Sequence, residues 1–278
     1  MIQISANVYV EHDYPVCNVG MVTTEAGVVL VDSPMRPSDA VRWREEAARR
    51  GEIRYLLHTD PHKDHFMGAW FFPGVMVSHR TSRERLAREN LEEVMTRFRQ
   101  IDPASMHLIG GYRVRLADIA FTGELDLRLG KHTFRLLELP GHSEGLCGVY
   151  LPEERVVFAS DCVFYHVRSA LYEADPAAWL ESLRRLNELD VDAIVPGHGS
   201  SVCKKDHLAE QTDIIRRWVD AVRAAKQKGM GPEEAVNTIS CPDPYPMIPG
   251  APMTAADLDK AIIHRLYRVL AEEERTSR

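Results

Sequence analysis

Residues 56–70 read LLHTDPHKDHFMGAW and place four common metal ligands within six consecutive positions. These ligands are Asp60, His62, Asp64 and His65. The preceding residues 53–59, IRYLLHT, form a nearly continuous apolar run that predicts a strand buried on both faces. The cluster therefore follows the carboxyl end of a predicted strand, where open α/β sheets place their ligand sites. Carboxylate and imidazole side chains suit zinc, manganese or iron, so the stretch predicts a metal-binding turn.

Three later stretches share this design, in which a strand runs into a turn that bears a ligand-type residue. They are LELPGHSEG with His142, VVFASDCVF with Asp161 and AIVPGHGS with His198. A glycine beside each of the two histidines lets the backbone turn sharply, so that the imidazole projects from the strand end. Together the four stretches supply four imidazoles and three carboxylates, a set that suits two divalent ions sharing one carboxylate.

The remaining sequence predicts two β-rich halves, each flanked by helices. Short apolar, β-branched runs bounded by turn residues indicate the strands. They lie at 7–10, 19–24, 27–33 and 53–59, and then at 125–130, 132–140, 148–152, 155–160 and 191–197. Helices are expected at 38–50, 176–189, 205–229 and 254–273. This arrangement predicts an α/β sandwich with helices on the outside.

The charge balance narrows the class of protein. The chain of 278 residues carries 34 basic and 41 acidic side chains, for a formal net charge of −7. That balance argues against a protein that coats nucleic acid, which usually presents a basic face. The segment 80–99 holds six arginines, but four glutamates lie among them, which predicts a solvated helix with intrahelical ion pairs.

Targeting and cysteine patterns favour a reduced, cytoplasmic protein. The start MIQISANVYVEHDY has neither the basic leader nor the apolar run of a secretory signal, and no run of eighteen apolar residues occurs. The five cysteines are scattered without a CxxC pair, which argues against a disulfide framework or a cysteine-rich zinc site. We expect a small-molecule substrate as the partner, with neither nucleic acid nor a membrane.

The four ligand-bearing motifs together resemble the metallo-β-lactamase superfamily. Its signature T-H-x-H-x-D-H is followed by P-G-H-[ST]-x-G, G-D-x-x-F and P-G-H-G turns. This chain has TDPHKDH, PGHSEG, SDCVF and PGHGS in that order, with a layout most similar to hydroxyacylglutathione-hydrolase-like and lactonase-like branches. The resemblance implies a four-layer αββα sandwich. Residues 1–203 would form the catalytic core, and residues 204–278 a helical C-terminal extension packed on it.

The resemblance also implies a dinuclear metal site. Two divalent ions are expected, zinc before manganese or iron, although the residues also allow a single ion. One ion would be held by Asp64, His65 and His198, the other by His62 and His142, with Asp161 as the bridge. The chain departs from the signature at Asp60, where the family has its first histidine, and at Ser160, where glycine is usual.

Asp60 leaves two interpretations open. As a ligand, its carboxylate would lower the charge of the core, weaken the activation of bound water and favour harder ions such as manganese or ferrous iron. As a non-ligand, it would act as a base beside a single ion. His58 points to the same face of the predicted strand, and is either a substitute ligand or a satisfied core histidine.

The implied function is metal-assisted hydrolysis, in which a metal-bound hydroxide attacks a small ester, thioester or lactone. Asp64 would orient the water or accept its proton. An iron-dependent oxidoreductase of the sulfur-dioxygenase type and a non-catalytic binding relative are the alternatives. Apolar residues on the helix 254–273 either pack inward or join two copies in a homodimer. The side chains expected to contact substrate are His12, Tyr14, Tyr165 and His166.

Overall fold

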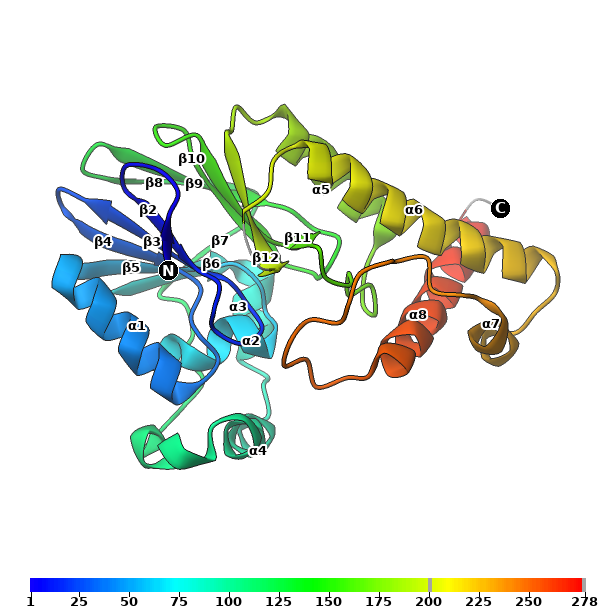
Figure 1. Ribbon diagram of the computed structural model, residues 1–278, viewed down its shortest axis with the longest axis horizontal. Coiled ribbons are helices and arrows are strands. Elements are labelled where there is room, and N and C mark those ends of the chain that lie inside the picture. Colours follow the sequence, from blue (N-terminus) through cyan, green and yellow to red (C-terminus); the bar gives the residue numbers. More distant parts are fainter. Residues whose placement is uncertain (200–201, 277–278) are drawn as a thin grey trace.

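The first sheet contains seven strands within residues 1–199 and 202–276, which the computed structural model describes (Figure 1). Strands β1 to β4 run antiparallel to one another, whereas β4 to β7 are parallel. Strand β5 therefore lies inside the sheet, as its continuous apolar sequence predicts. In sheet order the strands are β1 (Ile2–Gln3), β2 (Val8–Glu11), β3 (Val19–Thr24), β4 (Gly27–Val31), β5 (Ile53–His58), β6 (Val75–His79) and β7 (Ile119–Phe121).

The second sheet has five strands in the same part of the chain. In sheet order they are β12 (Ala193–Gly199), β11 (Val156–Tyr165), β10 (Cys147–Leu151), β9 (His132–Glu138) and β8 (Glu124–Leu129). β11 and β12 are parallel, and their register shifts between Phe158 and Ser160 and again between Ser160 and Phe164. The sequence suggested that Asp161 lies in a turn after the strand. Instead it lies at an irregularity inside β11. Such irregularities re-aim a side chain away from the regular pleat.

Three apolar clusters separate four layers. The central cluster lies between the sheets and joins Val29 and Leu57 of the first to Phe134 and Val149 of the second. Neighbouring side chains of a strand point to opposite faces, so Leu30 instead packs toward α1 (Pro37–Arg50) in a second cluster. The third covers the outer face of the second sheet with α5 (Pro176–Glu188). The predicted four-layer αββα sandwich is confirmed.

The C-terminal helices share the third cluster with α5 and β11. They are α6 (Asp206–Gln227), α7 (Pro232–Thr238) and α8 (Ala255–Thr276). Leu258, Ile262 and Leu266 of α8 are buried in this cluster, so its apolar face packs inward. Residues 277 and 278, the last two of the predicted extension, lie outside the described residues. Within the described ranges no helix is long and apolar enough to cross a bilayer.

The segment 80–99 is not the single helix that was expected. It is divided into α3 (Arg80–Leu86) and α4 (Leu91–Ile101), because the Asn90 side chain accepts a hydrogen bond from the Glu92 amide and starts a new helix. Its charges also pair outside the segment. Arg85 reaches Glu173 at 2.7 Å and Glu89 reaches Lys63 at 3.1 Å, and these pairs connect the segment to neighbours of the predicted metal ligands.

Candidate metal centre

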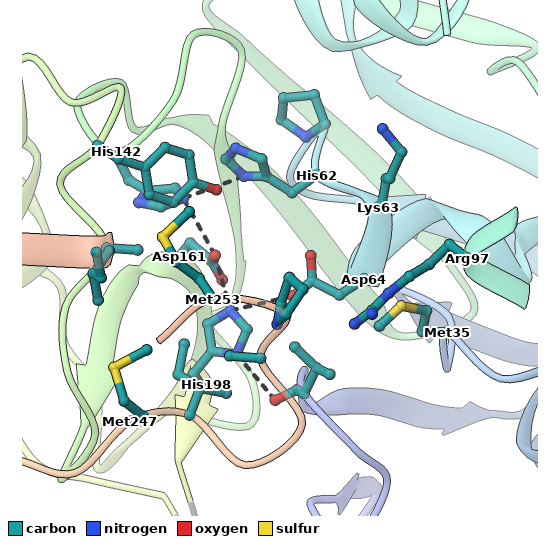
Figure 2. Close-up of a pocket in the computed structure, with 18 of the residues that line it drawn as sticks. Met35, His62, Lys63, Asp64, Arg97, His142, Asp161, His198, Met247 and Met253 are labelled. Carbon is teal, nitrogen blue, oxygen red and sulfur yellow. Dashed lines mark hydrogen bonds and ion pairs between the residues drawn. The ribbon is translucent and has the colours of Figure 1, made fainter. Parts of the chain in front are cut away.

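The seven predicted ligands, contributed by both sheets, come together in two adjacent groups. Asp60 lies two residues after the end of β5, His62 precedes α2 (Lys63–Phe66), and Asp64 and His65 lie within that helix. His142 follows β9, while His198 lies at the end of β12. Figure 2 shows His62, His142, Asp161, Asp64 and His198 facing a shared centre. Their assignment as metal ligands stays a prediction.

The first group consists of Asp60, His62, His142 and Asp161. His62 Nδ1 lies 2.5 Å from Asp60 Oδ1 and 3.2 Å from His142 Nε2. His142 Nε2 in turn lies 3.3 Å from Asp161 Oδ2. The fully buried Asp60 carboxylate also accepts hydrogen bonds from the Ser143 hydroxyl at 2.6 Å and the His62 amide at 2.8 Å. Asp60 therefore points at the same place as the two histidines, which favours its interpretation as a ligand.

The second group consists of Asp64, His65 and His198, and Asp161 connects it to the first. His198 Nε2 lies 3.0 Å from Asp161 Oδ2 and 3.4 Å from Asp64 Oδ2. His65 Nε2 lies 3.0 Å from the other oxygen of the same aspartate, Asp161 Oδ1. One carboxylate thus faces ligands of both groups, as a bridging residue must.

Two buried atoms that face each other in this centre have no hydrogen bond of acceptable geometry to any described residue. They are His65 Nε2 and Asp161 Oδ1. Leaving a buried polar atom unsatisfied costs about 1–3 kcal/mol, and a divalent cation between these atoms would satisfy both. The buried carboxylate–imidazole set is also one that zinc, manganese and iron accept. The residues therefore fit the metals that their pattern predicts.

The ionisation of the cluster shows how its charge is balanced. Burial by itself would raise the pKa of Asp161, but the charges of His198 and His65 lower it well below its usual range. Burial opposes protonation of His65, yet the Asp161 charge raises the pKa of this imidazole well above its ordinary value. For Asp60 the charge and hydrogen bond of His62 outweigh burial and lower the pKa. In the absence of metal, protons on the imidazoles supply the positive charge that balances these carboxylates. Divalent ions would replace those protons.

Two hydrogen bonds and one ion pair from the surrounding residues orient three of the four imidazoles. His65 Nδ1 donates to Asp32 Oδ2 at 2.9 Å, and His198 Nδ1 donates to the Val16 carbonyl at 2.9 Å. His62 Nε2 lies 2.9 Å from Glu173 Oε1. In each ring the nitrogen that faces outward is held, so the opposite nitrogen faces the centre. Such outer partners fix the tautomer and orientation of histidine ligands.

Two small details of the backbone shape the site. Gly197, the glycine before His198, packs so closely that a Cβ there would lie 2.0 Å from Asp161 Oδ1. Ser160 adopts a left-handed backbone with φ of 50°, a conformation that glycine takes without strain. This explains why its position favours glycine in the signature. The serine hydroxyl instead forms a 2.7 Å hydrogen bond with the Thr59 hydroxyl.

A cavity of about 420 Å³ opens above the centre. Its floor includes Asp64 and His198, while its walls come from α3, α4 and the loop that precedes α8. Figure 2 shows Met247 and Met253 of this loop on one side of the centre, and Lys63 and Arg97 on the other. The proline-rich segment before α8 therefore covers the site, which its composition alone did not indicate.

None of the four residues expected to contact substrate is among the described residues that line this cavity. His12 lies 3.8 Å from Asp13, and Tyr14 packs edge-on against Trp43. Tyr165 and His166 line a separate pocket with His207 and Glu210, beside the start of α6. His166, His207 and Glu210 form a third group of ligand-type side chains, but His207 is already hydrogen-bonded to the Phe164 carbonyl at 2.7 Å and to Glu210 at 3.1 Å.

His58 lies outside both ligand groups. The imidazole is buried, and its Nδ1 contacts the Ser82 hydroxyl at 3.3 Å. Burial lowers its pKa to about 4, so the ring is neutral at physiological pH. These observations favour the core histidine over the substitute ligand.

Residues 13–198 match the family described as Metallo-beta-lactamase superfamily. The chain belongs to the metallo-beta-lactamase superfamily. The match ends at His198, the last of the predicted ligands, and the resemblance drawn from the four motifs is confirmed. Solved structures of this superfamily share the fold. The chain superposes on a metallo-beta-lactamase family protein from Thermus thermophilus with a TM-score of 0.67, covering 96% of this chain and 94% of that one at 18% identity.

Two curated relatives of the chain carry different named activities. The 2,4-dinitroanisole O-demethylase subunit alpha of a Nocardioides strain is 26% identical over 67% of this chain and 53% of its own length. The hydroxyacylglutathione hydrolase of Bartonella henselae is 39% identical over 25% of this chain and 28% of its own length. The chain thus spans about half, or less, of the length of these relatives. The similarity to the named hydrolase supports hydrolase chemistry as a class.

Proposed function

We propose that this chain is a metal-dependent hydrolase that cleaves a small ester, thioester or lactone with two divalent ions, zinc foremost. One observation carries the proposal. Asp161 faces His142 with one oxygen and His65 with the other, so a single buried carboxylate lies between two groups of ligand-type side chains. Divalent ions at such a centre activate water and polarise the electrophile. The named hydrolases among the relatives support the same class of reaction.

The chain's own residues supply position and proton transfer. Asp64 is exposed to the cavity, with 17% of its side chain accessible, whereas Asp60 and Asp161 are buried. Asp64 is therefore the carboxylate that would orient a water molecule and take its proton. Tyr172 also lines the cavity, and burial together with the charge of Asp64 raises its pKa well above the ordinary value. The phenol stays protonated and available as a hydrogen-bond donor to a developing oxyanion.

Metal content and turnover test this proposal together. Tag-free protein, purified without added metal, would be analysed for zinc, iron and manganese by mass spectrometry and assayed against matched ester, thioester and lactone substrates. We expect two ions per chain and turnover that a chelator abolishes and zinc restores. His62→Ala and His142→Ala should each lose one ion and most activity. Full turnover by a stably folded His62→Ala enzyme would contradict two-metal catalysis.

An iron-dependent oxidoreductase is the second candidate, and Asp60 is the observation that favours it. A carboxylate at position 60 makes the first group harder, which suits ferrous iron more than a histidine at that position would. Iron at two ions per chain, a visible colour and oxygen consumption with a thiol substrate would replace the hydrolase proposal. Zinc with chelator-sensitive hydrolysis would exclude this candidate.

A further inference from the structure

Among the described residues, three lysine or arginine side chains line the cavity, and carboxylates already neutralise two of them. Lys63 pairs with Glu89 at 3.1 Å, and Arg85 forms two hydrogen bonds with the carboxylate of Glu173 at 2.7 and 3.2 Å. Arg97 is different. Within the described part of the chain it has no carboxylate within ion-pair distance, and its one hydrogen bond goes to the Gly250 carbonyl at 3.3 Å.

Arg97 is also placed where a charge matters. The side chain leaves α4, is partly buried and reaches toward Asp64 and the metal centre (Figure 2). Burial lowers the pKa of this guanidinium, an effect that the charge of Asp64 opposes. If Asp64 ligates a cation, its negative charge is neutralised by that ion. The positive charge of Arg97 then faces the cavity without a carboxylate to balance it. An arginine without a carboxylate in a partly desolvated site is an anion-binding group, because its fork of N–H donors matches carboxylate geometry.

The loop before α8 gives the cavity an apolar wall. Met247, Ile248, Pro252 and Met253 of the loop before α8 present apolar side chains to the same space. The loop is tied to the body of the protein through Asp243, which accepts from the Ser169 amide at 2.9 Å. Its tip is tied to Arg97 through Gly250. The cavity therefore combines the guanidinium of Arg97 with a wall of flexible methionine side chains, which adapts to varied apolar groups.

We propose that Arg97 binds a carboxylate on the substrate, and that the apolar remainder of that substrate packs against the Met247–Met253 loop. Arg97 is then a specificity-determining residue that selects amphipathic, anionic esters or thioesters over neutral ones. This inference rests on the proposed hydrolase function for its kinetic consequence, although the binding site itself does not depend on turnover.

Binding tests the site without catalysis. Metal-loaded protein would be titrated calorimetrically with hexanoate and with neutral hexanamide. Arg97→Met should weaken hexanoate binding about tenfold or more and change hexanamide binding much less, since a charge-assisted contact is lost. Arg97→Lys should recover part of the loss. Arg99→Met is the matched control, because Arg99 lies on the same helix but pairs with Glu92 and is 52% exposed. Equal hexanoate affinity in wild type and Arg97→Met would overturn the proposal.

Kinetics separates this inference from the hydrolase proposal. Monophenyl succinate and phenyl butyrate differ chiefly in a terminal carboxylate, and their ratio of kcat/KM measures anion selection. We expect Arg97→Met to lower that ratio about tenfold, mainly through KM, and Arg99→Met to leave it unchanged. If no substrate is turned over but hexanoate binding still depends on Arg97, the hydrolase proposal is wrong and the anion site stands. If substrates are turned over but the ratio of kcat/KM is the same in wild type and Arg97→Met, the hydrolase proposal stands and the anion site is wrong.

Discussion

Asp32 Oδ2 accepts a hydrogen bond from His65 Nδ1 at 2.9 Å, so the residue that follows β4 orients a ligand from the motif that follows β5. The same carboxylate accepts from the Thr59 amide at 2.8 Å and from the Thr59 hydroxyl. Asp32 is buried and has a left-handed φ of 57°. A residue held in this conformation by three hydrogen bonds fixes both the ligand turn and the imidazole within it.

Asp32→Asn should weaken metal binding at the His65 group. The amide keeps the size of the side chain but loses the charge that favours Nδ1–H on His65, and loss of such an outer partner costs about 10–100-fold in metal affinity. Zinc titration with a competing chromophoric chelator would measure this. We expect one ion to bind normally and one weakly. Two unchanged affinities in the folded variant would show that Asp32 supports the fold alone.

Asp60 can be tested by exchange in two directions. Asp60→His should keep two ions and raise the preference for zinc over iron, because an imidazole replaces a hard oxygen ligand. Asp60→Asn removes the charge while keeping the Ser143 contact geometry, and should lose the ion of the first group. Metal analysis after growth with defined zinc and iron gives the readout. Unchanged stoichiometry in Asp60→Asn would identify Asp60 as a non-ligand.

Glu173→Gln should loosen His62. The Glu173 carboxylate lies 2.9 Å from His62 Nε2 and also pairs with Arg85. Burial alone would raise the pKa of Glu173, but its contacts with His62 and Arg85 lower it to about 2. The glutamine keeps the shape and loses the charge, so we expect a lower affinity for the ion of the first group by about tenfold or more. Glu181→Gln, on the exposed face of α5, is the matched control and should leave metal affinity unchanged. A stoichiometry and affinity equal to wild type would contradict a positioning role.

Gly197→Ala should disable the centre while Gly110→Ala does not. A Cβ at position 197 would lie 2.0 Å from Asp161 Oδ1, so the bridging carboxylate must move. At position 110 the added Cβ meets no heavy atom of the described residues within 4 Å. We expect Gly197→Ala to lose metal and activity, with circular dichroism showing whether the fold persists. Normal metal content in Gly197→Ala would mean that the bridge has more freedom than its packing indicates.

Glu154 should contribute to stability in a pH-dependent way. Burial would raise the pKa of this carboxyl, but the neighbouring side chains of Ser5, Asn7 and His132 lower it from 4.5 to about 2. Above pH 4.5 the stabilisation is fully present, and it is lost as the pH falls toward 2, because the unfolded chain takes up the proton first. Denaturant unfolding of wild type and Glu154→Gln should therefore show a stability difference that shrinks across this range. A constant difference would exclude the ionised carboxylate as its source.

Much of the fold could be predicted from the sequence because the local patterns agree with the tertiary structure. The continuous apolar run at residues 53–59 predicts a strand inside a sheet, and β5 lies there between parallel neighbours. Asp175 caps α5 by accepting from the Ala178 amide at 3.0 Å, as its place before Pro176 predicts. The prediction of one helix over residues 80–99 was wrong because it followed the mixed arginine and glutamate side chains along the segment. Asn90, a capping residue in its middle, decides where the second helix begins.

The sequence by itself predicted which side chains could bind a metal and in what order they follow one another, because each motif is a local pattern of a strand and a ligand-type side chain within a few residues. Only the tertiary structure decided what surrounds them. Asp32, Glu173 and Arg97 lie in unrelated local sequence, and nothing nearby in the chain marks them. Their roles come from packing that brings the end of β4, the segment before α5 and α4 itself to one centre. Contacts between distant segments depend on the whole fold, so no local pattern records them.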